Sequence, residues 1–121
     1  MPVQGTPDQL VGILRETVVS LVRRDGPDLS ARQLGVFLTV YLGEGPHTVR
    51  GLASGLLVAK PAVSRALDRL EDLGLARRLI DPADRRSVVV QRTVRGSAFV
   101  REIREMISEG HRAFGGAVVS S

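Results

Sequence analysis

The chain has 121 residues, enough for one domain with a single modest core, and its 43% of hydrophobic residues argues against intrinsic disorder. The absence of cysteine excludes a disulfide framework, a zinc–thiolate site and a thiol-based sensor. The net charge is +4, no apolar run approaches the roughly 20 residues that span a bilayer, and the N-terminus lacks a signal-peptide pattern, so we expect a cytoplasmic protein without a membrane partner.

The first two expected elements are helices. Apolar residues at helical spacing predict a helix over residues 7–24, whose apolar face is wide enough to be buried on two sides. A turn at residues 25–28 separates it from a second helix, which Ser30 caps and which runs to about Leu42. The Gly- and Pro-containing segment 43–46 ends that helix.

Two shorter helices joined by a tight turn are expected next. Thr48 caps the first of them, over residues 49–56, and His47 is expected to be a loop residue that leads into this cap. After a turn at residues 57–59 comes a second helix, with Pro61 in its first turn and Gly74 at its end. Its buried stripe leaves polar side chains facing outward, namely Ser64, Arg65, Asp68, Arg69 and Asp72.

A hairpin and a last helix complete the expected fold. Residues 75–80 and 87–92 are predicted strands on either side of a polar turn, residues 81–86. Thr93 caps a helix to about Gly110, and the tail over 115–121 is expected to be frayed. We therefore expect a mainly α fold with a small β-hairpin wing. It is a single domain over residues 1–121, with a winged helix-turn-helix at 30–92 and flanking dimerisation helices at 7–24 and 93–110.

Basic residues concentrate in the expected winged helix. Residues 50–95 hold ten basic and five acidic side chains, whereas the rest of the chain holds seven and eight. This distribution favours DNA as the partner. The outward side chains of the helix after the turn suit the major groove, and those of the hairpin tip suit the minor groove. The candidate DNA-binding residues are Lys60, Pro61, Ser64, Arg65, Arg69, Arg85 and Arg86.

Several short motifs in this order and spacing resemble the MarR family of bacterial regulators. They are Leu52-Ala53, Val63-Ser64-Arg65, Asp68-Arg69-Leu70-Glu71, Gly74-Leu75, the wing sequence at 81–86, and Thr93 followed by Gly96, within residues 30–109. The resemblance implies a homodimer on a near-palindromic site, with Ser64 and Arg65 in the major groove. It also implies that Arg86 lies in the minor groove, braced by Asp84. A small-molecule effector would bind between the dimer helices and the winged helix.

The sequence departs from the family pattern around the turn. Gly51 stands where the family usually has an acidic residue, Leu57 replaces the usual turn glycine, and Ala59 replaces a capping side chain. We expect the turn to form with an altered geometry. Family members also usually continue into a further dimerising helix after the last helix of this chain.

Some roles stay open at the level of the sequence. Asp84 can instead close its own turn through an Asx contact. Strand alternation leaves only one of Arg77 and Arg78 clearly outward. His47 and His111 lack clustered carboxylates, so no metal site is expected. No nucleophile, acid–base pair or phosphate loop emerges, so we expect neither an enzyme nor a cofactor.

Two functions from different classes remain. The first is a sequence-specific transcription regulator, acting as a repressor on a near-palindromic operator. The second is a winged-helix module that docks an acidic protein on its basic face. The first and last helices carry more apolar surface than a small core absorbs, so we also expect a symmetric homodimer built from these two helices.

Overall fold

The computed structural model describes residues 5–115, and the chain divides into two compact units. Residues 29–100 form what we call the winged-helix unit. The described parts of residues 1–28 and 101–121 form what we call the terminal unit. The tail that we expected to fray lies outside the described residues from position 116 onward.

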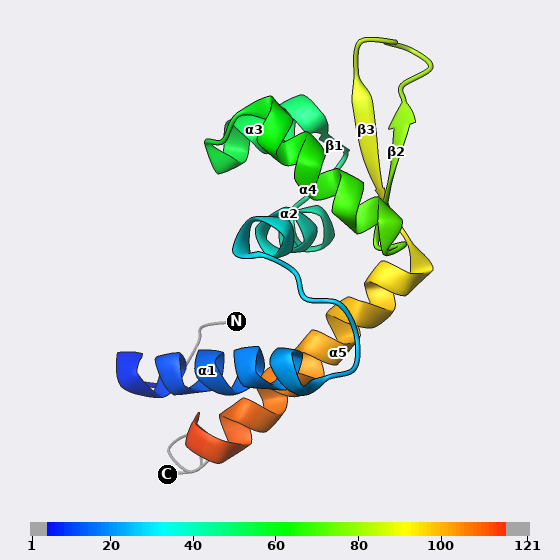
Figure 1. Cartoon of the computed structure of the whole chain (residues 1–121). Coiled ribbons are helices and arrows are strands. Elements are labelled where there is room, and N and C mark those ends of the chain that lie inside the picture. The colour runs from blue at the N-terminus through cyan, green and yellow to red at the C-terminus, as the bar shows by residue number, and fades with distance from the viewer. Residues whose placement is uncertain (1–4, 116–121) are drawn as a thin grey trace. The chain divides into compact units, whose positions relative to one another are not determined.

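The winged-helix unit confirms the mainly α fold with a hairpin wing. Its elements are α2 (Ala31–Leu42), β1 (His47–Thr48), α3 (Val49–Leu56), α4 (Lys60–Asp72), β2 (Ala76–Ile80), β3 (Val88–Arg92) and the first turns of α5 (Val94–Gly110). In Figure 1 the β2–β3 hairpin projects as an arm beyond α3 and α4. The expected helices and strands all form, with ends within one or two residues of those predicted.

One strand was missed by the sequence analysis. The sheet has three antiparallel strands in the order β1-β3-β2, and β1 pairs His47 with Val90 and Thr48 with Val89. The expectation that His47 is a loop residue was therefore wrong. A strand of two residues shows no alternation of polar and apolar side chains, so no periodic signal exists for it.

Side-chain caps mark the start of α2 and α3, whereas α4 begins without one and ends at a glycine. Ser30 and Gln33 form a reciprocal capping box at the start of α2, and the Thr48 hydroxyl accepts from the Gly51 N–H at the start of α3. Gly74 ends α4 with a left-handed φ of 72°. Ala59 precedes α4 without any side-chain cap hydrogen bond, as its small apolar side chain requires.

Giving α4 the missing cap should stabilise the protein. Ala59→Ser places a hydroxyl where the first N–H groups of α4 lack a side-chain acceptor, and Ala59 already has the extended backbone of an N-cap. We expect the free energy of unfolding to rise by about 0.5–2 kcal/mol in urea titrations. Ala59→Val, which adds bulk without an acceptor, should give no such gain. Equal stability of the serine and valine variants would contradict the prediction.

The core of the winged-helix unit lies where α2 meets α4. Val36, Phe37 and Val40 from α2 are fully buried, as are three residues of α4, namely Val63, Leu67 and Leu70. The ring of Phe37 also packs on Phe99 of α5, with centroids 5.2 Å apart. Because α4 is anchored along its buried stripe, its opposite face is held in a fixed direction.

A buried tyrosine joins three chain segments beside this core. The Tyr41 hydroxyl donates to the Leu75 carbonyl at 2.7 Å and accepts from the Thr93 N–H at 2.9 Å. The Thr93 hydroxyl in turn contacts the Gly74 carbonyl and the Gly96 N–H. The end of α2, the turn before β2 and the start of α5 are thus tied together, which fixes the base of the hairpin relative to the helices.

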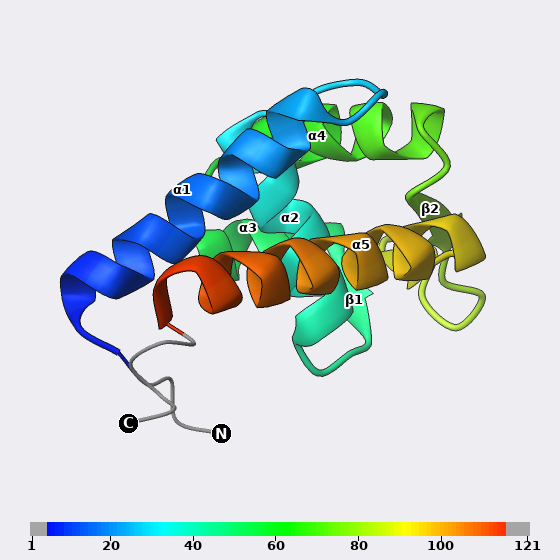
Figure 2. The same ribbon diagram turned by 90° about the horizontal axis from the view of Figure 1, so that it is seen from below.

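The terminal unit pairs α1 (Pro7–Arg23) with the end of the chain. Figure 2 shows α1 beside the C-terminal end of α5 and η1 (His111–Gly115), and these segments are in contact. The approach is close, because a Cβ on Gly12 would lie 3.2 Å from the Phe114 ring and one on Gly110 would lie 3.2 Å from the Ile13 carbonyl oxygen. Gly12 on α1 and Gly110 on α5 therefore allow the two segments to approach this closely.

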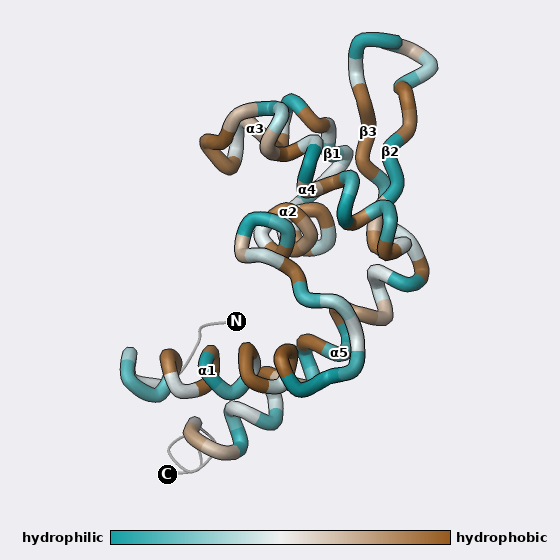
Figure 3. Tube along the Cα trace, viewed as in Figure 1, coloured by the Kyte–Doolittle hydropathy of each residue, from teal (hydrophilic) through white to brown (hydrophobic). Residues whose placement is uncertain are grey.

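One row of apolar side chains on α1 is left open to solvent. Figure 3 shows hydrophobic segments recurring along α1. Four of these side chains follow helical spacing and are between 46% and 69% exposed, namely Val11, Leu14, Val18 and Val22. We call them the α1 row. Protein–protein interaction surfaces often carry an exposed apolar stripe of this kind.

Candidate nucleic-acid interface

The turn between α3 and α4 sets the angle at which α4 is presented. Leu57 adopts the left-handed conformation, with φ 56° and ψ 42°, and its N–H bonds the last turn of α3. Leucine tolerates this conformation poorly, which explains why a glycine would be the usual choice there. The Leu57 side chain is 90% exposed, so the strain is not offset by burial. The helix-turn-helix forms despite this departure.

The exposed side of α4 carries most of the candidate DNA-binding residues. Lys60, Pro61 and Arg65 are exposed, and Ser64 and Arg69 are half-buried. The first two turns of α4 thus present a primary amine and a guanidinium to solvent. An arginine at such a position can donate two hydrogen bonds to O6 and N7 of a guanine.

The wing is an antiparallel hairpin whose tip is held by its own backbone. The pairs from Ala76–Arg92 to Ile80–Val88 hold β2 against β3, and the Asp81 N–H bonds the Ser87 carbonyl. Within the tip the Asp81 carboxylate accepts from the Ala83 N–H at 2.9 Å. The side chains of Arg85 and Arg86 are exposed at this tip. The hairpin therefore carries two exposed guanidinium groups at its narrow tip.

Asp84 closes its own turn in this structure. Its carboxylate accepts from the backbone N–H of Arg86 at 3.1 Å, which is the Asx contact that the sequence left open. Among the described residues, the ion pairs do not include one between Asp84 and an arginine. Bracing of the Arg86 guanidinium by Asp84 stays a prediction.

The structure separates the basic residues of this unit into two groups. Arg92 donates to the carbonyls of Val40 and Gly43 at the end of α2, and Arg95 lies 3.4 Å from the Leu73 carbonyl at the end of α4. Arg78 is ion-paired with two acids of α4. Among residues 50–95, all of which the structure describes, seven other basic side chains have no such partner, namely Arg50, Lys60, Arg65, Arg69, Arg77, Arg85 and Arg86.

Two neighbouring hollows link α4 to the wing. One, of about 290 Å³, is lined by Lys60 and Ser64 of α4 and by strand residues that include Arg78 and Leu79. The other brings Arg50 and Lys60 together with Arg86. Arg50 was not among the predicted site residues, because an exposed arginine in the first turn of a helix gives no signal beyond its charge. The fold places it beside two residues that were predicted.

The described residues also bear on a membrane-spanning helix and on a metal site. Among the helices that the structure describes, none has the length and hydropathy of a transmembrane segment. Within the same 111 positions, 5–115, no three histidine, aspartate or glutamate side chains gather as metal ligands would. The concentration of unpartnered cations around α4 and the wing is the main chemical feature of the winged-helix unit.

Sequence comparison places this unit among known proteins. The sequence profile of the MarR family matches residues 25–87. The HTH-type transcriptional regulator PecS of Dickeya dadantii (strain 3937) is 31% identical over an alignment of 86 residues, and the match covers 69% of this chain and 52% of PecS. The chain thus spans about half the length of this curated relative.

Structural comparison gives the same assignment. The transcriptional regulator Tm0710 from Thermotoga maritima matches with a TM-score of 0.67 at 28% identity, over 93% of this chain and 74% of that one. The transcriptional repressor CouR, bound to a 23-mer DNA duplex, matches with a TM-score of 0.66 over 88% of this chain and 69% of CouR. At 24% identity the likeness to CouR concerns the fold alone.

Proposed function

Because this chain belongs to the MarR family of transcription regulators, we propose that it is a sequence-specific repressor that binds a near-palindromic operator as a homodimer. The observation that carries the proposal is the set of cations without partners on α4 and the wing. Lys60 of α4 and Arg86 of the wing border the same hollow, and among the described residues neither side chain has an acidic partner. Such charges favour a polyanion on this face.

The proposed roles follow from position along each element. The N-terminal part of a recognition helix contacts base edges, so Arg65 and Ser64 read the major groove, and Arg69, one turn later, binds a phosphate. Arg85 and Arg86 at the exposed tip suit the minor groove, where the negative potential is strong. Arg50, Lys60 and Arg86 line one small hollow, so the charges of α3, α4 and the wing gather on the same face and together attract the DNA backbone. The effector that the resemblance implies stays a prediction.

Selection of bound sequences from a random DNA pool tests the function directly. We expect enrichment of one near-palindromic sequence, which we call the operator. Fluorescence anisotropy should then show tighter binding to the operator than to random duplex, with both affinities falling steeply as salt rises. A pool that shows no enrichment, together with salt-independent binding, would contradict the proposal and favour the protein-docking alternative.

Arg65 and Arg69 should have separable effects on DNA binding. We expect Arg65→Ala to cost about 1–3 kcal/mol on the operator and to relax the preference at one base pair of each half-site. Arg69→Ala should weaken binding to operator and random duplex alike and lower the salt slope by about 1. Anisotropy titrations on a panel of operator variants measure both effects. If Arg65→Ala preserves the ranking of the panel, its assignment to a base edge is wrong.

A further inference from the structure

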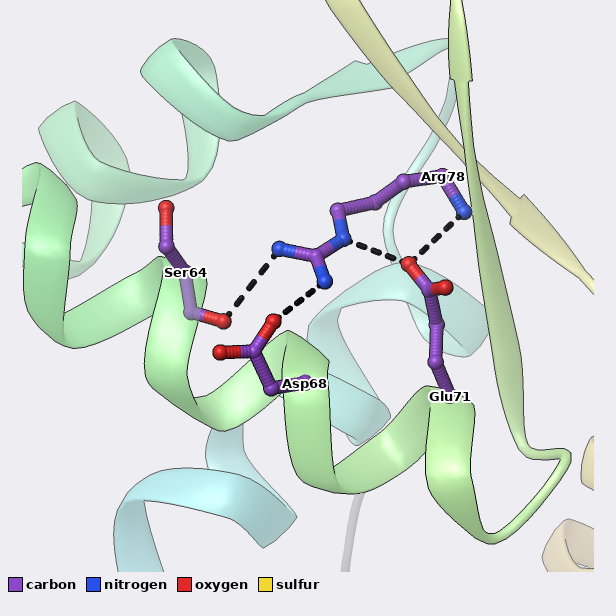
Figure 4. Close-up of polar contacts among 4 residues, drawn as sticks. All are labelled: Ser64, Asp68, Glu71 and Arg78. Carbon is purple, nitrogen blue, oxygen red and sulfur yellow. Dashed lines mark hydrogen bonds and ion pairs between the residues drawn. The ribbon is translucent and has the colours of Figure 1, made fainter.

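Arg78 makes the most extensive set of side-chain contacts in the winged-helix unit, and Figure 4 shows all of them. Its Nε donates to the Glu71 carboxylate at 2.5 Å, one Nη donates to the Asp68 carboxylate, and the other lies 3.3 Å from the Ser64 backbone carbonyl. The same Glu71 oxygen also accepts from the Arg78 backbone N–H at 3.2 Å. One arginine of β2 thus contacts three successive turns of α4.

These contacts leave Arg78 little capacity to bind DNA. Its side chain is 25% exposed and faces two carboxylates, so its charge is already neutralised. Burial by itself lowers the pKa of Arg78, but the hydrogen bonds and charges of Asp68 and Glu71 outweigh it and raise the pKa overall. Arg77, the preceding residue on the same strand, is exposed instead. The outward member of the pair is therefore Arg77.

The contacts between Arg78 and α4 lie beside the candidate DNA-binding residues. Ser64 and Asp68 lie on the same helix as Arg65 and Arg69, and β2 leads directly into the tip that carries Arg85 and Arg86. A hairpin held only at its base can swing, which would change the spacing between the two sets of DNA contacts. The contacts of the Arg78 guanidinium with Ser64, Asp68 and Glu71, which we call the fork, hold β2 to α4 at several points and restrict that motion.

We infer that Arg78 is a positioning residue that fixes the wing against α4 and thereby sets sequence preference without contacting DNA. The inference rests on the proposed function, and in it Arg78 acts by positioning the residues of α4 and the wing that contact DNA. Binding to the operator needs the base contacts of α4 and of the wing at the same time. Binding to random duplex needs only the positive charge. Loss of the fork should therefore lower the ratio of the two affinities.

Asp68→Asn/Glu71→Gln is the decisive variant, because a purely electrostatic role leaves the ratio of the two affinities unchanged, whereas a positioning role lowers it. It removes two negative charges beside the interface, so a purely electrostatic role would tighten binding to every duplex. We expect the ratio of operator affinity to random-duplex affinity to fall by about tenfold or more, since each well-formed base contact contributes about that much discrimination. Arg78→Gln should lower the ratio as well, and Arg78→Lys should restore part of it.

Arg77→Gln is the matched control, because it removes one positive charge from the same strand without touching the fork. Its affinity ratio should equal that of the wild type. A thermal unfolding curve of each variant shows whether it is as fully folded as the wild type at the temperature of the binding assay. An unchanged ratio in the double variant would overturn the inference, as would an Arg78→Gln variant that weakens both duplexes equally with a salt slope lower by about 1. A wild type without any sequence preference would instead overturn the proposed function.

Discussion

Gly96→Ala is expected to lower the free energy of unfolding by about 3 kcal/mol or more, a large share of the stability of a domain of this size. A Cβ at this position would lie 1.6 Å from the Tyr41 hydroxyl oxygen and 2.6 Å from the Leu75 carbonyl oxygen. Neither neighbour can move freely, because these two oxygens are hydrogen-bonded to each other. The added methyl group must therefore disrupt the junction of α2, β2 and α5.

Two further variants separate the clash from the ordinary effect of alanine in a helix. Gly35 lies within α2, and a Cβ added there would meet nothing within 4 Å, so Gly35→Ala should stabilise the protein by up to about 1 kcal/mol. Tyr41→Phe alone should cost about 1–3 kcal/mol, because it leaves the Leu75 carbonyl and the Thr93 N–H without a partner.

Urea titrations of the single and double variants measure the coupling between the two sites. In Gly96→Ala/Tyr41→Phe the closest clashing atom is gone, so the double variant should cost less than the two single variants added together. Additive costs would show that the Tyr41 hydroxyl is not the obstacle. A Gly96→Ala variant as stable as wild type would contradict the packing described for this junction.

Most of the fold could be predicted because it depends on local signals. Ser30, Thr48 and Thr93 are side-chain caps, and each precedes a helix in the structure. Apolar residues at helical spacing identified the buried faces, and two β-rich segments around a polar turn identified the wing. The two-residue strand β1 could not be predicted, since its pairing with β3 depends on residues more than 40 positions away.

The candidate site could be predicted less completely, because charge alone does not reveal partners. Arg77 and Arg78 are adjacent arginines of one predicted strand, and the sequence does not show which of them has an acidic partner. In the structure only Arg78 forms ion pairs with the two acids of α4. Arg92 and Arg95 counted toward the basic excess but contact carbonyls at the ends of α2 and α4. Such pairings depend on which side chains of an element face the neighbouring element in the folded protein. Sequence spacing predicts that a residue lies on an element, and packing decides what it meets.

Val18→Glu is expected to convert the protein from a dimer to a monomer and to weaken operator binding by about 10²-fold or more. The reason lies in the α1 row, which is 46–69% exposed in the single chain and has the spacing of a helix–helix contact. In the proposed homodimer this row packs against its symmetric copy, so a glutamate would bury two like charges together. Loss of the second half-site removes the gain in effective concentration that a dimer provides.

Sedimentation equilibrium at micromolar concentration measures the mass, and a titration against operator duplex gives the number of chains bound. Arg23→Gln is the control, because it changes the net charge of α1 by the same amount outside the α1 row. It should leave both results unchanged. Val11→Glu, at a position that is 63% exposed, repeats the test if the first variant folds poorly.

The two measurements also separate the dimer from the DNA-binding proposal. A wild type of monomer mass that binds one chain per operator would contradict the dimer, and with it the near-palindromic site and a spacing of about 34–36 Å between the two copies of α4. A Val18→Glu variant that stays dimeric would place the interface elsewhere on the chain. A monomeric Val18→Glu variant that keeps its affinity for random duplex would show that the winged-helix unit binds DNA by itself, because the cations of α4 and the wing lie within one unit.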